Sequence, residues 1–222
     1  MSLEQWTAVD GYIADHLIPA DPTLEAALAA SVVAGLPTIN VTPQQGKFLY
    51  LLARIQGARN ILEIGTLAGY STLWLARALP DDGRLVTLEL EPKHAAVARE
   101  NFERAGLASR IELRVGPAME TLGDLVAQQR GPFDLIFIDA DKMSMPEYFQ
   151  WAMKLSRKGT VIIADNVVRN GAVVDATSVD ESVRGVRRLM DFLSTEPRVT
   201  ATALQTVGNK GYDGFCLAVV NA

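Results

Sequence analysis

Residues 60–71 have the sequence NILEIGTLAGYS, and this stretch decides the fold. It begins with an apolar run that shows no polar alternation, and it continues through a turn with two glycines into the apolar segment STLWLA. A run of this kind is typical of a parallel strand that is buried on both faces and leads directly into a helix. The stretch therefore predicts the first strand, turn and helix of a doubly wound sheet.

The turn in this stretch is suited to binding a ligand. Gly65 and Gly69 let the backbone approach a bound molecule closely, and the start of the following helix offers free N–H groups. The spacing is Gly-x-x-x-Gly, with Glu63 two residues before the first glycine, whereas dinucleotide-binding folds use Gly-x-Gly-x-x-Gly to hold a pyrophosphate. An acid beside the turn favours a cationic ligand over a diphosphate.

A second acid supports this interpretation. Glu89 lies near the carboxyl end of the apolar segment 84–90, where an acid can accept hydrogen bonds from the 2′- and 3′-hydroxyls of a ribose. An adenosine with a positive centre and no pyrophosphate describes S-adenosylmethionine, so we predict this cofactor. The alternative is that the glycine turn only packs a strand against a helix.

Composition limits the classes of protein that fit. With 222 residues, of which 49% are hydrophobic, we expect a single domain over 1–222, with a helical appendage over 1–40 and a cofactor-binding catalytic core over 41–222. The formal charge of −5 disfavours general affinity for nucleic acid or an anionic membrane. A single cysteine, Cys216, excludes an intramolecular disulfide. Because no signal peptide and no apolar run of about 18 residues are present, we expect a cytoplasmic protein without membrane contact.

The first part of the chain predicts helices. A capping pattern at 2–5 precedes an apolar stripe at helical spacing, and a second helix is expected from Pro22 to about Ala34. These helices could close the active site, pack on the body or form a dimer contact, and we take a homodimer as the hypothesis. A third helix is expected after Thr42, with Thr42 as its cap and the Gln45 side chain reaching back to it. The stripe consists of Trp6, Val9, Ile13 and Leu17.

After the glycine turn, strand and helix patterns alternate. Strands are expected near 85–90, 110–115, 133–138 and 160–164, and helices over 92–105, 118–129, 145–156 and 180–194. The chain ends in two further strands, 199–204 and 214–220, joined by a glycine-bearing loop and antiparallel to each other. Together these patterns predict an α/β fold: a doubly wound, mostly parallel, seven-stranded Rossmann-like sheet with an antiparallel C-terminal strand, preceded by N-terminal helices.

Two of these strands deliver oxygen ligands at their carboxyl ends. Asp139 follows the strand 133–138, and Asp165 and Asn166 follow the strand 160–164, so all three are expected on the rim where open α/β sheets bind ligands. Oxygen donors without histidine or cysteine match a hard divalent cation, magnesium first, with calcium or manganese as alternatives. The competing interpretation is that Asp139 or Asp141 caps the next helix and that Asp165 and Asn166 form a turn.

Three motifs together resemble the cation-dependent O-methyltransferases, the group of the caffeoyl-CoA and catechol O-methyltransferases. They are EIGTLAGYST at 63–72, DADK at 139–142 and DNVVRNG at 165–171, and the likeness extends from about Thr42 to the end of the chain. The resemblance implies a metal held by Asp139, Asp165 and Asn166. It implies S-adenosylmethionine bound by Glu63, Gly65, Ser71 and Glu89, with Pro117 and Ala118 near the adenine and Thr42 and Asp139 near the methionine end.

The resemblance also implies a reaction. The substrate would be a small phenol with two vicinal hydroxyls, of the catechol or caffeoyl type. The metal would lower the pKa of the hydroxyl that it binds. Lys142 is the candidate for proton acceptor or phenolate stabiliser, and a solvated surface lysine is the alternative.

Two further predictions concern residues around the rim. His16 and His94 are expected in helices away from the rim. Arg169 and Asn170 could meet a polar tail of the substrate or lie in an exposed loop.

Three rival functions stay open. Relatives of this group include enzymes that methylate a hydroxylated base in tRNA, and Arg184, Arg187 and Arg188 fall on one predicted helix face that could meet phosphates. The acidic net charge counts against nucleic acid. A nicotinamide-dependent oxidoreductase on the same fold would need the glycine spacing that is missing here, and a non-catalytic module would bind the cofactor without turnover.

Overall fold

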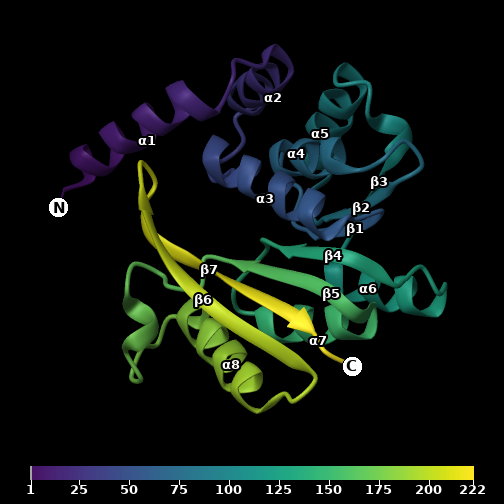
Figure 1. The fold of residues 1–222 in the computed structure, drawn as a ribbon, viewed down its shortest axis with the longest axis vertical. Coiled ribbons are helices and arrows are strands. Elements are labelled where there is room, and N and C mark those ends of the chain that lie inside the picture. The colour runs from purple at the N-terminus through teal and green to yellow at the C-terminus, as the bar shows by residue number, and fades with distance from the viewer. Residues whose placement is uncertain (1) are drawn as a thin grey trace.

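The computed structural model describes residues 2–222, and its centre is one sheet of seven strands (Figure 1). The strand order is β3-β2-β1-β4-β5-β7-β6, and only β7 runs against its two neighbours. This confirms the predicted doubly wound sheet with a reversed strand near the C-terminus. The strands are β1 (Asn60–Ile64), β2 (Arg84–Glu89), β3 (Ile111–Val115), β4 (Phe133–Ile138), β5 (Ser156–Asp165), β6 (Val199–Gly208) and β7 (Gly211–Val220).

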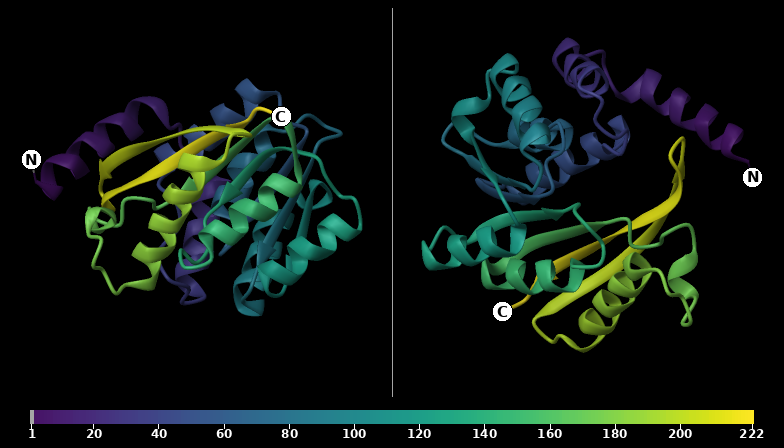
Figure 2. Two further views of the ribbon diagram at one scale, coloured as in Figure 1. Left: turned by 90° about the horizontal axis from the view of Figure 1, so that it is seen from below. Right: turned by 180° about the vertical axis from the view of Figure 1, so that it is seen from behind.

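Helices cover both faces of the sheet (Figures 1 and 2). One face carries α3 (Pro43–Gln56), α4 (Tyr70–Ala78) and α5 (Pro92–Arg104), and the other carries α6 (Ala118–Ala127), α7 (Met145–Lys154) and α8 (Glu181–Thr195). Two short 3-10 turns, Ala108–Arg110 and Ala172–Val174, lie in the connections. This three-layer arrangement buries the central strands completely.

Strand β1 shows why the opening stretch lacks polar alternation. Ile61 packs in the core beneath α4, whereas Leu62 and Ile64 pack in the core beneath α6 and α7. All three side chains have no exposed surface. Each such burial contributes about 1.5–3 kcal/mol to stability, so hydrophobic residues occupy both faces of this strand.

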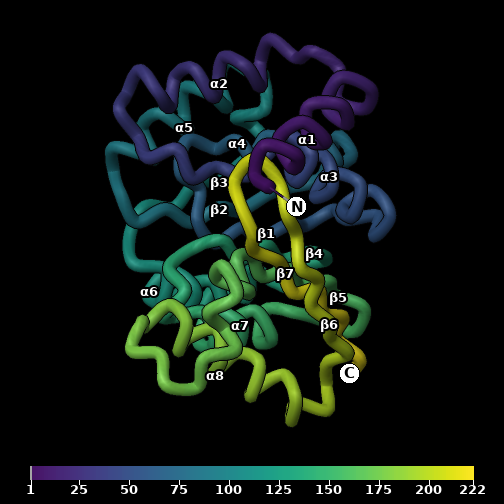
Figure 3. Tube along the Cα trace, turned by 90° about the vertical axis from the view of Figure 1, so that its left-hand side faces the viewer, coloured from purple at the N-terminus to yellow at the C-terminus, as the bar shows by residue number. Residues whose placement is uncertain are grey.

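The N-terminal helices differ in how they attach. Helix α2 (Pro22–Val33) is capped by Asp21, which also pairs with Arg77 of α4, and it buries Leu24 and Ala27. Helix α1 (Leu3–Leu17) buries no residue and lies across the tip of the β6–β7 hairpin (Figure 3), where Asn209 N donates to Asp10 Oδ2 at 2.7 Å. Within residues 2–222 there is no helix of the length and apolar character that crossing a membrane requires.

The C-terminal hairpin is longer than the sequence predicts. The apolar alternation ends near Leu204, yet β6 and β7 stay paired until Gly208 and Gly211, which leaves a two-residue turn. A strand at the edge of a sheet does not need an apolar pattern to pair with its neighbour. Polar residues such as Thr206 therefore continue the hydrogen-bonded pairing of β6 with β7. The extension carries Lys210 toward the rim of the sheet.

The amino ends of β1, β4 and β5 are joined by the buried Asp134. Its carboxylate accepts from Arg59 N at 2.8 Å, from Asn60 N at 3.0 Å and from Arg157 Nη2 at 2.6 Å. Burial alone would raise the pKa of Asp134, but these donors hold the pKa below its usual value. The carboxylate therefore stabilises the fold above its ordinary pKa, and this contribution is lost as the pH falls through the lowered value.

We predict that Asp134→Asn lowers the free energy of unfolding at pH 7 by about 1–3 kcal/mol, because buried donors lose a charged acceptor. Urea unfolding at pH 7 and pH 3 measures this, and the deficit is expected to shrink at the lower pH. Asp81→Asn, at a fully exposed side chain, is the control. A deficit that is the same at both pH values would contradict the prediction.

Candidate active site

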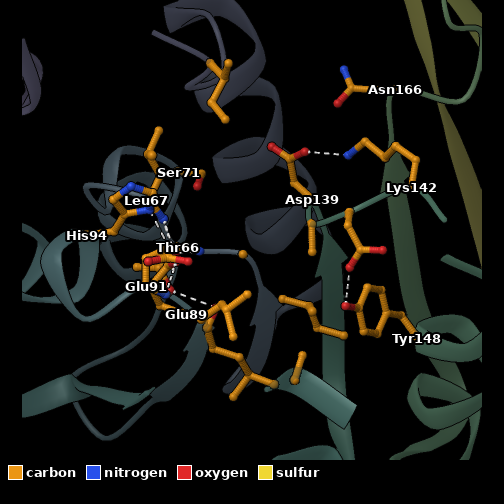
Figure 4. Close-up of a pocket in the computed structure, with 18 of the residues that line it drawn as sticks. Thr66, Leu67, Ser71, Glu89, Glu91, His94, Asp139, Lys142, Tyr148 and Asn166 are labelled. Carbon is orange, nitrogen blue, oxygen red and sulfur yellow. Dashed lines mark hydrogen bonds and ion pairs between the residues drawn. The ribbon is translucent and has the colours of Figure 1, made fainter. Parts of the chain in front are cut away.

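A cavity of about 850 Å³ opens at the carboxyl ends of β1, β2, β4 and β5. This is the rim predicted from the sequence. Most of the predicted site residues meet there, on two facing walls (Figure 4). Those that line this cavity are Gly65, Ser71, Glu89, Pro117, Ala118, Asp139, Lys142 and Asn166.

The glycine turn after β1 is pressed against the end of β4. Gly65 has a φ of +100°, and a Cβ atom at this position would lie 2.1 Å from the carbonyl oxygen of Asp139. Only glycine fits both the backbone conformation and this contact. The turn and the acidic end of β4 are therefore held together by the backbone.

Glu63 lies behind this turn and not in the cavity. Its side chain has no exposed surface and accepts hydrogen bonds from Ser71 Oγ at 2.6 Å, from Thr87 Oγ1 at 2.7 Å and from the Thr72 hydroxyl. Burial raises the pKa of Glu63 to about 7, although the three hydroxyls act to lower it. Ser71 lines the cavity and Glu63 does not, so the binding of the cofactor by Glu63 stays a prediction.

Glu89 and His94 form one wall of the cavity. One oxygen of Glu89 accepts from Leu67 N at 2.7 Å and from Thr66 N at 3.2 Å, and the other lies 3.4 Å from His94 Nδ1. His94 was expected away from the rim, and that expectation is wrong. Helix α5 begins at Pro92, immediately after β2, so His94 belongs to its first turn and lines the cavity. The short spacing between the end of β2 at Glu89 and His94 was the signal in the sequence that this histidine lies at the rim.

Asp139 and Lys142 form the opposite wall. Lys142 Nζ donates to Asp139 Oδ1 at 2.8 Å, and the lysine is buried, not solvated. The neighbouring Asp141 accepts from Ser144 N at 2.9 Å and from the Tyr148 hydroxyl, so it organises the start of α7. The helix-capping interpretation thus applies to Asp141, which leaves Asp139 facing the cavity.

Asp165 and Asn166 follow β5 at the same rim. Asp165 is 5% exposed, and its carboxylate accepts from Asn166 N at 2.8 Å and from Gln45 Nε2 at 2.6 Å. Burial, and then the negative charge of Asp139, raise the pKa of Asp165 to about 7. Asn166 has a left-handed φ of +59°, a conformation that non-glycine residues adopt mainly at functional sites or tight turns.

Two predictions concern the start of α3, and the structure confirms the cap at Thr42 and corrects the side-chain partner of Gln45. Thr42 caps α3 as predicted, since its Oγ1 accepts from Gln45 N at 3.1 Å. The Gln45 side chain does not reach back to Thr42 but crosses to Asp165. Thr42 itself lies outside the larger cavity.

A second cavity of about 660 Å³ adjoins the first. Thr42 and Asp165 line this second cavity, whereas Asn166 and Arg169 line both. The three predicted metal ligands therefore lie where the two cavities meet.

The chain matches the family model described as O-methyltransferase over residues 19–219. It belongs to the O-methyltransferase family. A catechol O-methyltransferase of Niastella koreensis is 54% identical over 99% of this chain and 100% of its own length. A catechol O-methyltransferase of Mycobacterium tuberculosis is also 54% identical, over 96% of this chain and 94% of its own.

Solved structures of the family carry the cofactor. The O-methyltransferase of Bacillus cereus in complex with SAH is 60% identical, with a TM-score of 0.98 and coverage of 99% of this chain and 100% of that one. An O-methyltransferase of Streptomyces achromogenes involved in tomaymycin synthesis, in complex with SAM, is 50% identical, with a TM-score of 0.97 and full coverage of both chains. The protein is an S-adenosylmethionine-dependent O-methyltransferase.

In this O-methyltransferase the buried Glu63 gives stability a distinctive pH dependence. Because the folded-state pKa of about 7 lies above the ordinary value of 4.5, the folded protein holds the proton that the unfolded chain releases. The contribution of this group to stability therefore falls as the pH rises from 4.5 to 7. Glu63→Gln removes this titration.

We predict that Glu63→Gln is more destabilising relative to wild type at pH 5 than at pH 8. Urea unfolding across this range measures the difference, with Glu100→Gln on the exposed face of α5 as the control. A deficit that is the same at pH 5 and pH 8 would mean that Glu63 is ionised in the folded protein throughout this range and would contradict the prediction.

Proposed function

We propose that the enzyme transfers the methyl group of S-adenosylmethionine to one hydroxyl of a small vicinal-dihydroxy aromatic substrate, of the catechol or caffeoyl type, with the help of a divalent cation. The observation that carries the proposal is that Asp139, Asp165 and Asn166 meet at the junction of two cavities. One cavity suits the cofactor, and the other leaves room for the substrate. A methyl donor and a phenol must meet in line, and such a junction supplies that alignment.

The proposed ligand set fits a hard cation. Two carboxylates and one amide oxygen are the donors that magnesium prefers, and calcium or manganese could replace it. Asp139 raises the pKa of the buried Asp165, which is the repulsion between like charges that a bound cation relieves. Among residues 2–222 no group of three or more histidine, cysteine, aspartate or glutamate side chains could hold a metal. The proposed set differs from such a group because its third ligand is the amide oxygen of Asn166. The two hydroxyls of a catechol would add further oxygen ligands, and the bound cation would lower the pKa of the reacting hydroxyl.

The larger cavity is the proposed place of the cofactor. Glu89, Pro117, Ala118 and Asp139 all line it. In the proposed arrangement Glu89 would accept from the ribose hydroxyls, Pro117 and Ala118 would lie near the adenine, and Asp139 would lie near the methionine end. Gly65 and Ser71 form the floor, with Glu63 acting through Ser71. Thr42 lies across the junction, near the proposed methionine end.

Lys142 is the proposed catalytic residue, together with Asp139. Its amine lies on the cavity wall and is oriented by the hydrogen bond to Asp139 Oδ1. Because Nζ already donates to a carboxylate, we favour a second donation to the phenolate oxygen over proton abstraction. Such a donor stabilises the oxygen while its methyl bond forms.

Methylation of a tRNA base is the second candidate, and the arginines of α8 bear on it. Arg184 donates to Glu181, Arg187 to the carbonyl oxygen of Val173 and Arg188 to that of Met143. All three thus have partners within the chain. This arrangement favours a structural role over phosphate binding.

We predict that methyl transfer from labelled S-adenosylmethionine to catechol and caffeate needs magnesium and stops with excess chelator. Asp165→Asn should lower the rate by about 100-fold because one anionic ligand is lost. Asp124→Asn, at an exposed position on α6, is the matched control. Transfer that survives both the chelator and Asp165→Asn, or transfer to tRNA alone, would contradict the proposal.

We further propose a homodimer through α1. This helix buries no residue. In the predicted stripe Trp6 and Ile13 are half-buried, whereas Val9 and Leu17 are each more than half exposed, as is the neighbouring Tyr12. The adjoining strand β6 adds exposed Leu204 and Val207. A second copy of the chain would cover this apolar surface.

The dimer predicts that Val9→Asp combined with Leu17→Asp halves the mass of the particle. Sedimentation velocity of the full chain measures the mass, with Val179→Asp, at an exposed valine outside this surface, as the control. A wild-type protein that sediments as a monomer would contradict the proposal.

A further inference from the structure

The second cavity contains features that catechol chemistry alone does not require. Its wall carries Phe48 and Phe215, whose ring centroids lie 5.1 Å apart, and this apolar surface suits an aromatic ring. Two cationic residues, Lys210 and Arg169, also line it. They come from separate loops, so their presence at one opening results from the tertiary fold.

The tip of the β6–β7 hairpin fixes the position of Lys210. Gly208 pairs with Gly211, and Asn209 N donates to Asp10 Oδ2 at 2.7 Å, so the turn is anchored on both sides. The Lys210 amine donates to the backbone oxygen of Asn40, and in the described part of the chain it has no carboxylate as an ion-pair partner. A cation with only a neutral partner retains capacity to bind an anion.

Lys210 also lies close to the proposed cation site. Partial burial lowers the pKa of this lysine, and the negative charges of Asp139 and Asp165 act against that shift. The amine is therefore within electrostatic reach of both carboxylates. A substrate whose hydroxyls are held at Asp165 and Asn166 would extend its ring substituent into the cavity that Lys210 lines.

Arg169 is a second donor at the same cavity. It follows β5 with a left-handed φ of +56°, and the N–H groups of Val168 and Arg169 donate to Asp213 Oδ1 at 2.9 and 3.0 Å. Its Nη1 lies 3.8 Å from Asp213 Oδ2, while its Nε is buried and has no hydrogen-bond partner. An unpartnered buried donor beside a cavity indicates a missing acceptor.

The acids of this cavity, in contrast, all have partners. Asp213 accepts from the backbone and lies near Arg169, Asp10 accepts from Asn209 N, and Asp165 belongs to the proposed cation site. Among the described residues, Asp10 and the Lys210 amine each have a neutral hydrogen-bond partner and no ion-pair partner. The cationic donors of the cavity that remain available to an anionic group are therefore the Lys210 amine and the unpaired Nε of Arg169.

We propose that the second cavity recognises a carboxylate on the ring substituent of the substrate, with Lys210 as the specificity-determining residue and Arg169 as a second donor. This inference rests on the proposed function and names its substrate class: catechols with an acidic side chain. One amine and one partly paired guanidinium match a single carboxylate, whereas a diphosphate would need more positive charge.

The test compares three catechols whose side chains are anionic, neutral and cationic: 3,4-dihydroxycinnamate, its methyl ester and dopamine. Steady-state kinetics with magnesium are measured on wild type, Lys210→Met, Lys210→Glu and Lys158→Met, the last at an exposed lysine near the opposite end of β5. We expect Lys210→Met to raise the ratio of the KM for the acid to the KM for the ester about tenfold, as loss of a charge-assisted hydrogen bond implies. Lys210→Glu should raise this ratio further and lower the KM for dopamine, and Lys158→Met should leave the ratio as in wild type.

Two kinetic outcomes would overturn the inference. An equal rise in KM for acid and ester would mean that Lys210 only supports the hairpin. A wild-type preference for dopamine would mean that the acids of the cavity select an ammonium group.

Equilibrium binding separates this inference from the proposed function. Calorimetry with magnesium and S-adenosylhomocysteine gives the affinity for the acid and for the ester without turnover. If none of the catechols is methylated, the proposed function fails, but the carboxylate site still stands when Lys210→Met weakens binding of the acid about tenfold more than binding of the ester. Equal weakening of the binding of acid and ester, or no weakening of either, would overturn the carboxylate site.

Discussion

The contact between the backbone of Gly65 and the carbonyl of Asp139 is the constraint on which the site depends. A Cβ atom at position 65 would lie 2.1 Å from that oxygen, so the turn after β1 and the end of β4 approach as closely as two peptide chains can. The hydrogen bond from Asp139 N to Ile64 O at 2.8 Å closes the same junction. The floor of the larger cavity and its acidic wall are consequently one rigid unit, and their separation does not vary with side-chain rotamers.

Around this junction the protein buries two carboxylates at the rim of the sheet. Glu63 is held by three hydroxyls and Asp165 by an amide and a backbone N–H, so neither is left without donors. Burial nevertheless raises the pKa of both. Neutral donors compensate only part of the desolvation of a carboxylate, which is why these acids reduce stability near neutral pH. Such unfavourable burial persists where it positions groups for binding or catalysis.

The sequence predicted the parts of the molecule that local patterns control. The mostly parallel seven-stranded sheet, the glycine turn and the arrival of Asp139 and Asp165 at one rim follow from the alternation of elements and from the geometry of parallel sheets. The errors concern side-chain direction. Gln45 has the spacing of a capping residue, yet a carboxylate 120 positions away in the chain is the stronger acceptor. Nothing in the local pattern distinguishes the two, because the competing partner is brought close only by the fold. His94 was misplaced for a simpler reason: its helix begins at the rim, so the first turn belongs to the site.

The two cavities are assembled from different parts of the chain. The larger is lined mainly by residues of the β1–β4 region, whereas the second needs Asp10 near the amino terminus together with 206–215 near the carboxyl terminus. During synthesis on the ribosome, the second cavity cannot form until almost the whole polypeptide has emerged. A truncated chain that stops before the last hairpin would retain the strands and the turn that form the floor of the first cavity while lacking the wall of the second. Completion of the hairpin is therefore the step of biosynthesis at which the second cavity, the proposed substrate site, gains its wall.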